Sequence, residues 1–398
     1  MKQPQLLFFG LVSLFACNDA SGPPDTSGRQ HWITLSAGVY HSCGIATDGS
    51  AFCWGLNPSG ALGNGDPTVA SVRPVRVLTD LRFISISVGG AFSCGLTPAN
   101  RAYCWGAGFG GALGDGKNTS SAIPVAVADD HAFTQISVGF EHVCALTPTG
   151  EAYCWGDNLS GELGDGTKLR RSIPTLVVSN IAFKSISAGN LQTCALSFQG
   201  TAFCWGGSSY GEAGVTCDTV PCVLPTPQPV SGDLTFAAIS AGNTFTCAVS
   251  TSSEAWCWGG LDLPWGTGMG RLGVLGDGSS RGSAIPVRVA GNHRFTEVVA
   301  GTRSACGVTE GSEAYCWGVN SGGELGIGTV DDISHANPTR LGGRITWSHI
   351  TAGDSSCGLD QQGVAYCWAM IYGEPDASGG IRIQGLWTSP TLLPNPVK

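Results

Sequence analysis

The sequence predicts an all-β fold, a β-propeller, on three observations. A unit of about 50 residues recurs seven times along the 398-residue chain. Every unit carries one Cys-x9-Cys pair, and the second cysteine lies in an Ala-aromatic-Cys-Trp motif. Short apolar segments separated by Gly, Asp and Asn turns give each unit about four strands. A period near 50 residues with four strands per unit is typical of propeller blades.

The elements of a unit follow in a constant order. A short strand ends in a motif such as Ser-x-Gly, and the cysteine-bearing hairpin comes next. A Gly-x-x-x-x-Gly-x-Leu-Gly loop then leads to a strand that contains proline. In Ala152–Trp155, Tyr153 and Trp155 share one face while the cysteine takes the other. Apolar side chains on both faces indicate a sheet covered on both sides, as in a propeller.

The hairpin explains the cysteine spacing. A three-residue loop needs a left-handed residue at its last position, and Gly49, Gly150, Gly200, Gly363 and Asn100 occupy it. This loop sets the two cysteines directly opposite each other, with Cα atoms roughly 4.5–5.5 Å apart. A disulfide can bridge that distance. Units five and six have Ser253 and Ser312 there instead, which predicts different loops.

We therefore expect seven hairpin disulfides and one further bridge. Each hairpin bridge would contribute about 2–3 kcal/mol by chain entropy. Zinc held by four cysteines is the alternative, although zinc sites use closer cysteine pairs. The expected pairs are Cys43–Cys53, Cys94–Cys104, Cys144–Cys154, Cys194–Cys204, Cys247–Cys257, Cys306–Cys316, Cys357–Cys367 and Cys217–Cys222.

The N-terminus carries the pattern of an export signal. Lys2 precedes an apolar run from Leu6 to Ala16, which is too short to span a bilayer. Leu14–Cys17 resembles the bacterial lipoprotein signal, which implies a lipidated Cys17, the one cysteine left unpaired. We expect a signal peptide over residues 1–16, lipidated Cys17 and a flexible tether over 17–30, and the propeller over 31–398. An ordinary secretory signal is the alternative.

The repeat resembles that of the regulator of chromosome condensation family. The family's Gly-x-Asn-x-x-Gly-x-Leu-Gly-x-Gly pattern is matched by Gly55–Gly65, Gly156–Gly166 and Gly318–Gly328, and Ser137–Leu146 resembles a second family motif. The resemblance covers about residues 31–395 and implies a seven-bladed propeller. We expect the C-terminal strand to complete the first blade and close the ring. Members include protein-binding modules and a guanine nucleotide exchange factor.

Composition and motifs offer little chemistry. A net charge of −9 argues against nucleic acid as a partner. His41 and His142 occupy a position where other copies have Phe, which favours a structural role. Asp115, Asp165 and Asp277 each lie in Leu-Gly-Asp-Gly, as turn residues do. We expect no catalytic residue, metal or cofactor.

Function is more often found where copies of a repeat differ. Unit five replaces the short loop by residues 259–278, which include Trp265, Met269 and Arg271. These residue types are enriched at protein interfaces. The loop of unit four contains Cys217 and Cys222, so both insertions should lie on one rim. Neutral drift of the loop sequences is the alternative.

The sequence thus predicts an extracytoplasmic, lipid-anchored propeller that serves as a non-catalytic protein-binding scaffold. Its partner would be a protein or another macromolecule of the envelope or the exterior. We expect a monomer at the periplasmic face or the cell surface, attached to the membrane only through its lipid. The alternatives are a lyase or hydrolase with its site in the propeller mouth, exchange-factor activity, and a purely structural role in the envelope.

Overall fold

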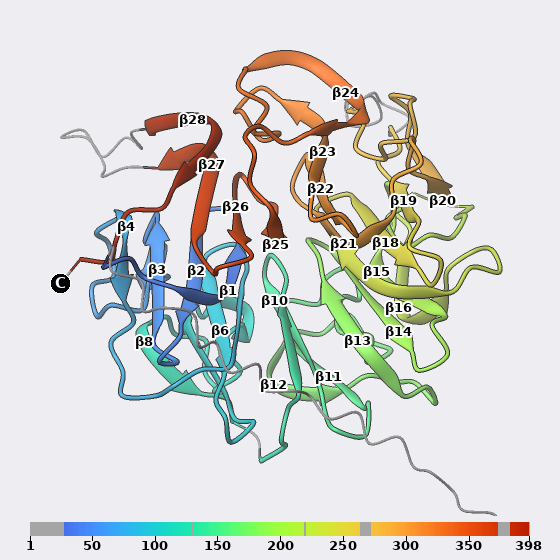
Figure 1. Cartoon of the computed structure of the whole chain (residues 1–398). Helices are drawn as coiled ribbons and strands as arrows, with labels where there is room; N and C mark the ends of the chain where they lie inside the picture. The colour runs from blue at the N-terminus through green and yellow to red at the C-terminus, as the bar shows by residue number, and fades with distance from the viewer. Residues whose placement is uncertain (1–27, 129, 219, 263–271, 373–382, 398) are drawn as a thin grey trace, which may run out of the picture.

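The chain folds into seven four-stranded antiparallel sheets arranged around an axis (Figure 1). The computed structural model describes residues 28–128, 130–218, 220–262, 272–372 and 383–397. Each sheet is one blade made of four consecutive strands, so the all-β, seven-bladed prediction is confirmed. No helix in these ranges is long and apolar enough to cross a membrane.

The first two strands of each blade are the two nearest the central axis of the ring. The innermost strands are β1 (Trp32–Ala37), β5 (Ser85–Val88), β9 (Gln135–Val138), β13 (Phe183–Ala188), β17 (Phe236–Ala241), β21 (Phe295–Ala300) and β25 (Trp347–Thr351). The second strands are β2 (His41–Ala46), β6 (Phe92–Leu96), β10 (His142–Leu146), β14 (Gln192–Ser197), β18 (Phe245–Ser250), β22 (Ser304–Thr309) and β26 (Ser355–Asp360).

The last two strands complete each blade, with short 3₁₀ turns η1 (Pro58–Gly60) and η2 (Phe109–Gly111) between them in blades one and two. The third strands are β3 (Ala51–Gly55), β7 (Ala102–Gly106), β11 (Ala152–Gly156), β15 (Ala202–Gly207), β19 (Ala255–Gly259), β23 (Ala314–Asn320) and β27 (Ala365–Tyr372). The outer strands are β4 (Ser71–Arg76), β8 (Ser121–Ala126), β12 (Arg171–Leu176), β16 (Val223–Pro229), β20 (Ser283–Arg288), β24 (Asp331–Arg340) and β28 (Ile383–Leu392).

The hairpin between the second and third strands of a blade has the predicted geometry. Gly49 and Asn100 take positive φ values of 80° and 57°. The expectation that the hairpins of blades five and six differ is wrong. Ser253 and Ser312 adopt φ values of 61° and 59°. The amide of Ser253 also donates to the Ser250 carbonyl, as the amide of Gly49 does to the Ala46 carbonyl.

A disulfide crosses every blade between these strands. In each blade the two cysteines are register partners, as Cys43 and Cys53 are in blade one. Their Cα atoms lie 4.0–4.1 Å apart, slightly closer than expected. Cys217 and Cys222 form an eighth bridge in the loop of blade four. The predicted pairing is therefore present in all eight cases.

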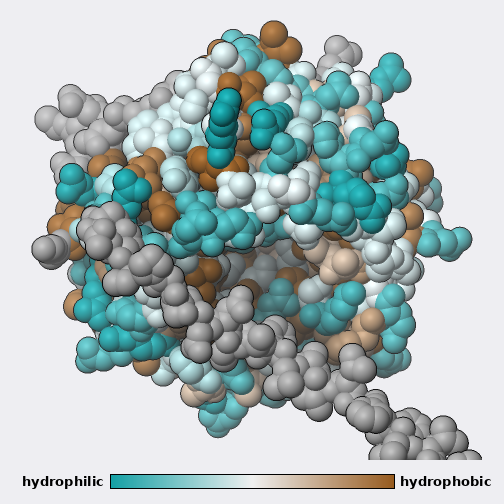
Figure 2. Space-filling view, viewed as in Figure 1, coloured by the Kyte–Doolittle hydropathy of each residue, from teal (hydrophilic) through white to brown (hydrophobic). Residues whose placement is uncertain are grey.

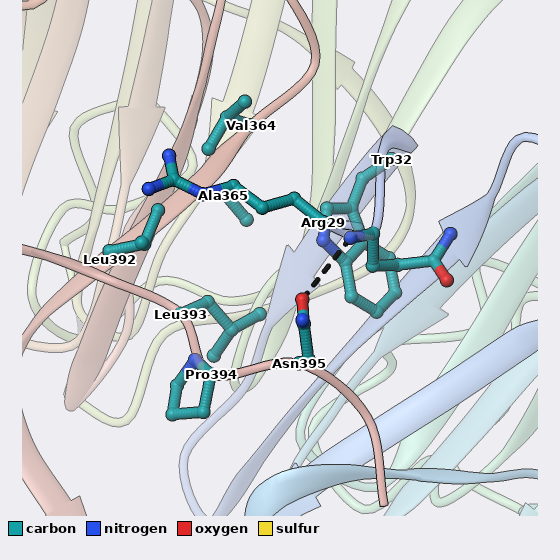
Figure 3. Close-up of a pocket in the computed structure, with 9 residues that line it drawn as sticks. Arg29, Trp32, Val364, Ala365, Leu392, Leu393, Pro394 and Asn395 are labelled. Carbon is teal, nitrogen blue, oxygen red and sulfur yellow. Dashed lines mark hydrogen bonds between the residues drawn. The ribbon is translucent and has the colours of Figure 1, made fainter. Parts of the chain in front are cut away.

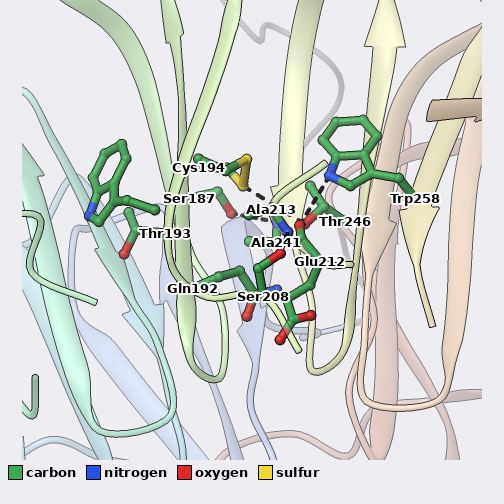
Figure 4. The surroundings of a disulfide bond; sticks show 12 residues. Ser187, Gln192, Thr193, Cys194, Ser208, Glu212, Ala213, Ala241, Thr246 and Trp258 are labelled. Atoms are coloured by element: carbon green, nitrogen blue, oxygen red, sulfur yellow. Dashed lines mark hydrogen bonds between the residues drawn. A yellow bond between two sulfur atoms is a disulfide. The ribbon is translucent and has the colours of Figure 1, made fainter. Parts of the chain in front are cut away.

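Neighbouring blades are joined by the tryptophan of the Cys-Trp motif. In five blades its indole N–H donates to a backbone carbonyl in the Gly-x-Leu-Gly loop, or its equivalent, of the preceding blade, as Trp205 does to Glu162 at 2.8 Å and Trp258 to Glu212 at 3.0 Å. The indole N–H groups of Trp54 and Trp105 are buried without an acceptor among the described residues. Figure 4 shows Trp258 directed at this segment beside the disulfide of Cys194. Trp155, Trp317 and Trp368 make the same bond. The repeated tryptophan thus acts between blades.

The outer strands explain the repeated proline. Each is the unpaired edge of its sheet, and proline removes an N–H that a foreign strand would use. Pro74, Pro174 and Pro286 lie within such strands. Proline therefore protects the circumference of the ring against edge-to-edge pairing.

The ring closes differently from our expectation. The prediction that the C-terminal strand completes the first blade is wrong, because β28 pairs with β27 in blade seven and blade one consists of β1–β4. The first described strand, β1, is innermost in its blade and the last, β28, is outermost, so each of the seven described blades consists of four consecutive strands.

The two ends of the ring meet through side chains and short backbone contacts. The Gln30 amide donates to Asn395 Oδ1 at 3.2 Å, and the Val397 amide donates to the Pro74 carbonyl at 3.0 Å. Trp32 and Leu393 line a cavity of about 200 Å³ at this seam (Figure 3). Blade seven is thus held to blade one without a shared sheet.

Replacing the inter-blade tryptophan tests its contribution. We expect Trp205→Phe to lower the free energy of unfolding by about 2–4 kcal/mol, because a buried hydrogen bond and part of a fully buried side chain are lost. Urea denaturation followed by circular dichroism measures this. Trp256→Phe is the matched control, since the indole N–H of Trp256 is buried without an acceptor among the described residues. Equal losses in both variants would contradict the role of the inter-blade bond.

Candidate functional site: the mouth of the central channel

One end of the ring gathers the variable loops. In a four-stranded antiparallel blade, the loop after the first strand and the loop after the third strand lie at the same end. This end therefore carries the short central loops that follow β1 and its equivalents. It also carries the Cys217–Cys222 loop of blade four and the long loop of blade five between β19 and β20.

The short central loops surround a hollow of about 390 Å³ at the channel mouth. All seven blades contribute to its lining, and Figure 2 shows the ring hollowed at its centre. The residue after the repeated glycine differs from blade to blade. In the lining these residues are Val39, Gly90, Phe140, Asn190, Asn243 and Thr302. Blades one to three thus present an apolar side chain or a glycine at the mouth, and blades four to six present amide and hydroxyl groups.

The backbone of the mouth is hydrogen-bonded from blade to blade. The Phe140 amide donates to the Gly189 carbonyl at 3.0 Å, and the Asn190 amide donates to the Gly242 carbonyl at 3.1 Å. A Cβ atom on Gly89 would lie 2.1 Å from the Gly139 carbonyl oxygen. Only glycine allows this approach, which explains the repeated Gly of the motif. The hollow is therefore preformed.

The lining offers hydrogen bonding rather than acid–base chemistry. Among the described residues that line the hollow, no side chain is ionisable, and Asp354 follows the lining residue Gly353 in the central loop of blade seven. Asn190 Nδ2 donates to Asn243 Oδ1 at 2.6 Å across the boundary of blades four and five. Within the described ranges, no group of three or more His, Cys, Asp or Glu residues is arranged to hold a metal ion. The arrangement is suited to receiving a polypeptide loop.

Exposed apolar residues lie on the loops of blades two to four at the same end. Phe109 is 72% exposed, Leu159 60% and Leu191 38%. Between them, Arg170 Nε forms a short ion pair with Asp157 Oδ1. An aromatic ring, leucines and an arginine are residue types typical of protein interfaces. We call Phe109, Leu159, Leu191 and Arg170 the rim.

Two glutamates are buried, one in the Gly-x-Leu-Gly loop of blade three and one in the equivalent loop of blade four, where Ala213 replaces the leucine. Burial raises the pKa of Glu162 to about 7 and that of Glu212 to about 8, although hydrogen bonds from backbone amides oppose the rise. Glu212 Oε2 accepts the Tyr210 amide at 2.7 Å. Glu324, at the same position of blade six, instead pairs with Arg303 at 3.2 Å. Glu212 is therefore protonated at neutral pH, and Glu162 is partly so.

The histidines of the repeated position are structural, as the sequence indicated. His41 and His142 are 1% exposed, and their Nε2 atoms bond the hydroxyls of Ser93 and Thr193 in the next blade. Burial lowers the pKa of His41 to about 3 and that of His142 to about 4. Both histidines are neutral at physiological pH.

The aspartates of Leu-Gly-Asp-Gly hold their own turns, as expected. Asp115, Asp165 and Asp277 each accept the backbone amide two residues later at 2.9–3.0 Å. Asp165 also pairs with Arg171. These carboxylates are occupied within the loops and are not directed at the mouth.

The predicted partner-binding residues Trp265, Met269 and Arg271 lie outside the described residues, as does Cys17. They stay predictions. From the sequence we expected the propeller mouth only as the site of an alternative enzyme, and we did not identify the lining residues, the four rim residues or the buried glutamates. The signal for the mouth was present in the variation of the residue that follows a constant glycine, from Val39 to Thr302.

Comparisons with known proteins agree with this architecture. A family model described as RCC1-like domain matches residues 10–358. The human probable E3 ubiquitin-protein ligase HERC6 is 36% identical over 83 residues, which cover 20% of this chain and only 8% of that protein.

Two solved structures illustrate the shared fold. Yeast RCC1 (Prp20), in a crystal structure with Kap60, has a TM-score of 0.73 and 20% identity, covering 93% of this chain and 86% of that one. The CRINKLY WD40 ectodomain of the Arabidopsis thaliana receptor kinase ACR4 has a TM-score of 0.53 and 21% identity, covering 89% and 100%.

The buried glutamates predict a pH dependence of stability. Above pH 4.5 the unfolded chain loses the Glu212 proton, while the folded chain keeps it up to about pH 8. The stability associated with Glu212 is therefore greatest below pH 4.5 and is lost as the pH rises toward 8. We expect Glu212→Gln to remove this loss. The difference in free energy of unfolding between the variant and the parent should therefore be at least about 1 kcal/mol more favourable to the variant at pH 8.5 than at pH 5, given about 1.4 kcal/mol per pKa unit.

Urea denaturation of both forms at the two pH values measures the effect. Glu151→Gln, on the exposed hairpin of blade three, is the control and should leave the pH profile of the parent unchanged. The same profile for Glu212→Gln and the parent would show that Glu212 ionises normally in the fold.

Proposed function

Because the chain belongs to the family of RCC1-like domains, we propose that it is a non-catalytic scaffold that binds a protein partner at the channel mouth and the rim. The observation that carries the proposal is the preformed hollow of about 390 Å³ at the end of the ring where the variable loops gather. Its volume lies at the lower end of ligand pockets. It suits one or two side chains of an inserted loop better than a large cofactor.

The distribution of side chains supports a two-part contact. Phe140 and Val39 offer an apolar side of the mouth, and Asn190 and Asn243 offer amides on the other. The exposed rim next to it would contribute the larger apolar area. Yeast RCC1, which shares the fold, was crystallised with the protein Kap60. The described residues of the mouth lining carry no ionisable side chain, so we assign them no acid–base step.

We also propose that the protein is exported and anchored through a lipid on Cys17. The bridges argue for an oxidising compartment, since sixteen cysteines are paired in the structure and disulfides rarely persist in the cytosol. Cys17 is the cysteine that remains outside these pairs. A chain so attached would present the propeller to proteins of the envelope or the exterior.

Binding-site variants test the proposed surface. Affinity capture of the tagged protein from its own envelope fraction, with mass spectrometry, would identify the partner. We expect Phe109→Ala and Phe140→Ala each to weaken binding at least about tenfold, as interface anchors do. Phe198→Ala is the matched control, because Phe198 is 59% exposed on a hairpin at the opposite end of the ring. A deletion of residues 261–270 tests the long loop of blade five.

The outcomes separate the alternatives. A partner retained by both mouth and rim variants but lost in the Phe198 variant would place binding at the other end. Capture of no protein, together with turnover of a small molecule by the purified chain, would favour an enzyme.

The anchor makes a separate prediction. Cys17→Ser should move the exported protein from the membrane fraction to the soluble fraction, because a stable attachment would require the acylated cysteine. Fractionation with immunoblotting measures the distribution, and metabolic labelling with a fatty acid checks the modification. Unchanged membrane association without label in the parent would refute lipidation at Cys17.

A further inference from the structure

Blades six and seven lack the serine clip that joins each of blades one to five to the next blade. In five interfaces a serine hydroxyl near the end of the innermost strand accepts an amide of the next blade at 2.9–3.0 Å. The serines are Ser36, Ser87, Ser137, Ser187 and Ser240. In blade six Val299 occupies this position and has no hydroxyl. In blade seven Thr351 occupies it, and its hydroxyl donates to Cys357 in the same blade at 3.3 Å.

Two other side chains span these interfaces instead. Glu297 of β21 accepts the Ile350 amide of β25 through Oε2 at 3.2 Å. Its Oε1 lies 2.8 Å from Nδ1 of His349, also on β25. Nε2 of His349 lies 3.2 Å from the Leu35 carbonyl oxygen of β1. Glu297 and His349 therefore connect blade six to blade seven and blade seven to blade one.

The geometry determines the protonation state that makes both contacts. The Leu35 carbonyl and the Glu297 carboxylate can only accept hydrogen bonds. Both ring nitrogens of His349 must carry a proton to donate to them at once, so the pair requires an imidazolium. Burial lowers the pKa of His349, but the hydrogen bond and charge of Glu297 and the bond to Leu35 outweigh this, and the net pKa lies above its usual 6.5.

Among the ionisable groups around His349, Glu297 is the one in direct contact with the imidazole. Strands β1 and β22, which pack against β25, have no ionisable side chain. On β26 the ionisable residue is Asp360, and it is in register with Trp347 at the far end of β25, whereas His349 is in register with Leu359. Asp354 follows β25 in the central loop.

We propose that Glu297 and His349 form a pH-dependent latch that holds blade seven in the ring. The protonated pair clips three blades together. Loss of the proton removes one of the two contacts of His349 and loosens the seam, where no strand is shared between blades seven and one. The neutral counterpart of the latch occurs in blade three, where Gln135 bonds both the amide and the carbonyl of Ile186 in blade four.

The direction of the effect follows from linkage. The folded pKa of His349 is raised, so its contribution is fully present below pH 6.5 and is lost as the pH rises through the folded value. Within that window the opening equilibrium of the seam should grow by up to about tenfold per pH unit.

Hydrogen exchange of the full-length, disulfide-bonded protein tests the latch. Between pH 6 and pH 9, after correction for intrinsic exchange rates, we expect protection to fall in peptides covering residues 31–37 and 345–352. The peptide covering residues 183–188, held by Gln135, is the internal control and should keep its protection. An equal response of all three peptides would overturn the proposal.

Variants identify the group responsible. Glu297→Gln reproduces the neutral pairing of Gln135, so it should keep the seam closed at pH 9 and abolish the pH response. His349→Ala, which cannot reproduce the neutral pairing of Gln135, should open the seam at both pH values. NMR titration of the imidazole, assigned with the His349 variant, should give a pKa above 6.5 in the parent and a lower one in Glu297→Gln. A parent value at or below 6.5, or the same value in both forms, would refute the latch without depending on the stability of any variant.

Discussion

The propeller depends on the contact in which the tryptophan of one blade inserts beneath the Gly-x-Leu-Gly loop of the blade before it. A four-stranded sheet with buried side chains on both faces cannot cover itself, so each blade is stable only against its neighbours. The indole fills the space between two sheets, and in five blades its N–H meets a loop carbonyl, as with Trp258 and Glu212. The same contact fixes the loops that form the functional end of the ring.

Local features of this fold could be predicted from the sequence, and the details of packing between blades could not. The Cys-x9-Cys spacing predicted the hairpin and its disulfide, because ten residues of chain determine both. The left-handed serines were mispredicted because the closing hydrogen bonds of the hairpin outweigh the preference of Ser253 for other conformations. The closure of the ring was mispredicted for another reason. β28 is the proline-containing last strand of its unit and pairs with β27 of the same blade, so the constant order of elements in the repeat already indicated blade seven for it.

The candidate site illustrates the same division. The repeated glycine after the first strand of each unit could be recognised in the sequence. The reason that glycine is required, which is the close approach of Gly89 to the Gly139 carbonyl of the next blade, could be seen only in the structure. Buried acids in the Gly-x-Leu-Gly loop and its equivalent look like ordinary surface residues in the sequence. Glu162 and Glu212 are nevertheless buried, because the loop that contains them also supplies the carbonyl for the next tryptophan. Their protonation follows from a position that the inter-blade contact imposes.

A ring without a shared strand concentrates its weakness at one seam. Six of the seven blade boundaries follow one another along the chain, so covalent connection limits how far those blades can separate. The boundary of blades seven and one has no such connection, and it relies on contacts such as those of Asn395, Trp32 and His349. The seam is therefore the place where a single protonation can alter the whole ring. The mouth is formed by all seven blades, so a change at this seam would also reach the proposed binding surface.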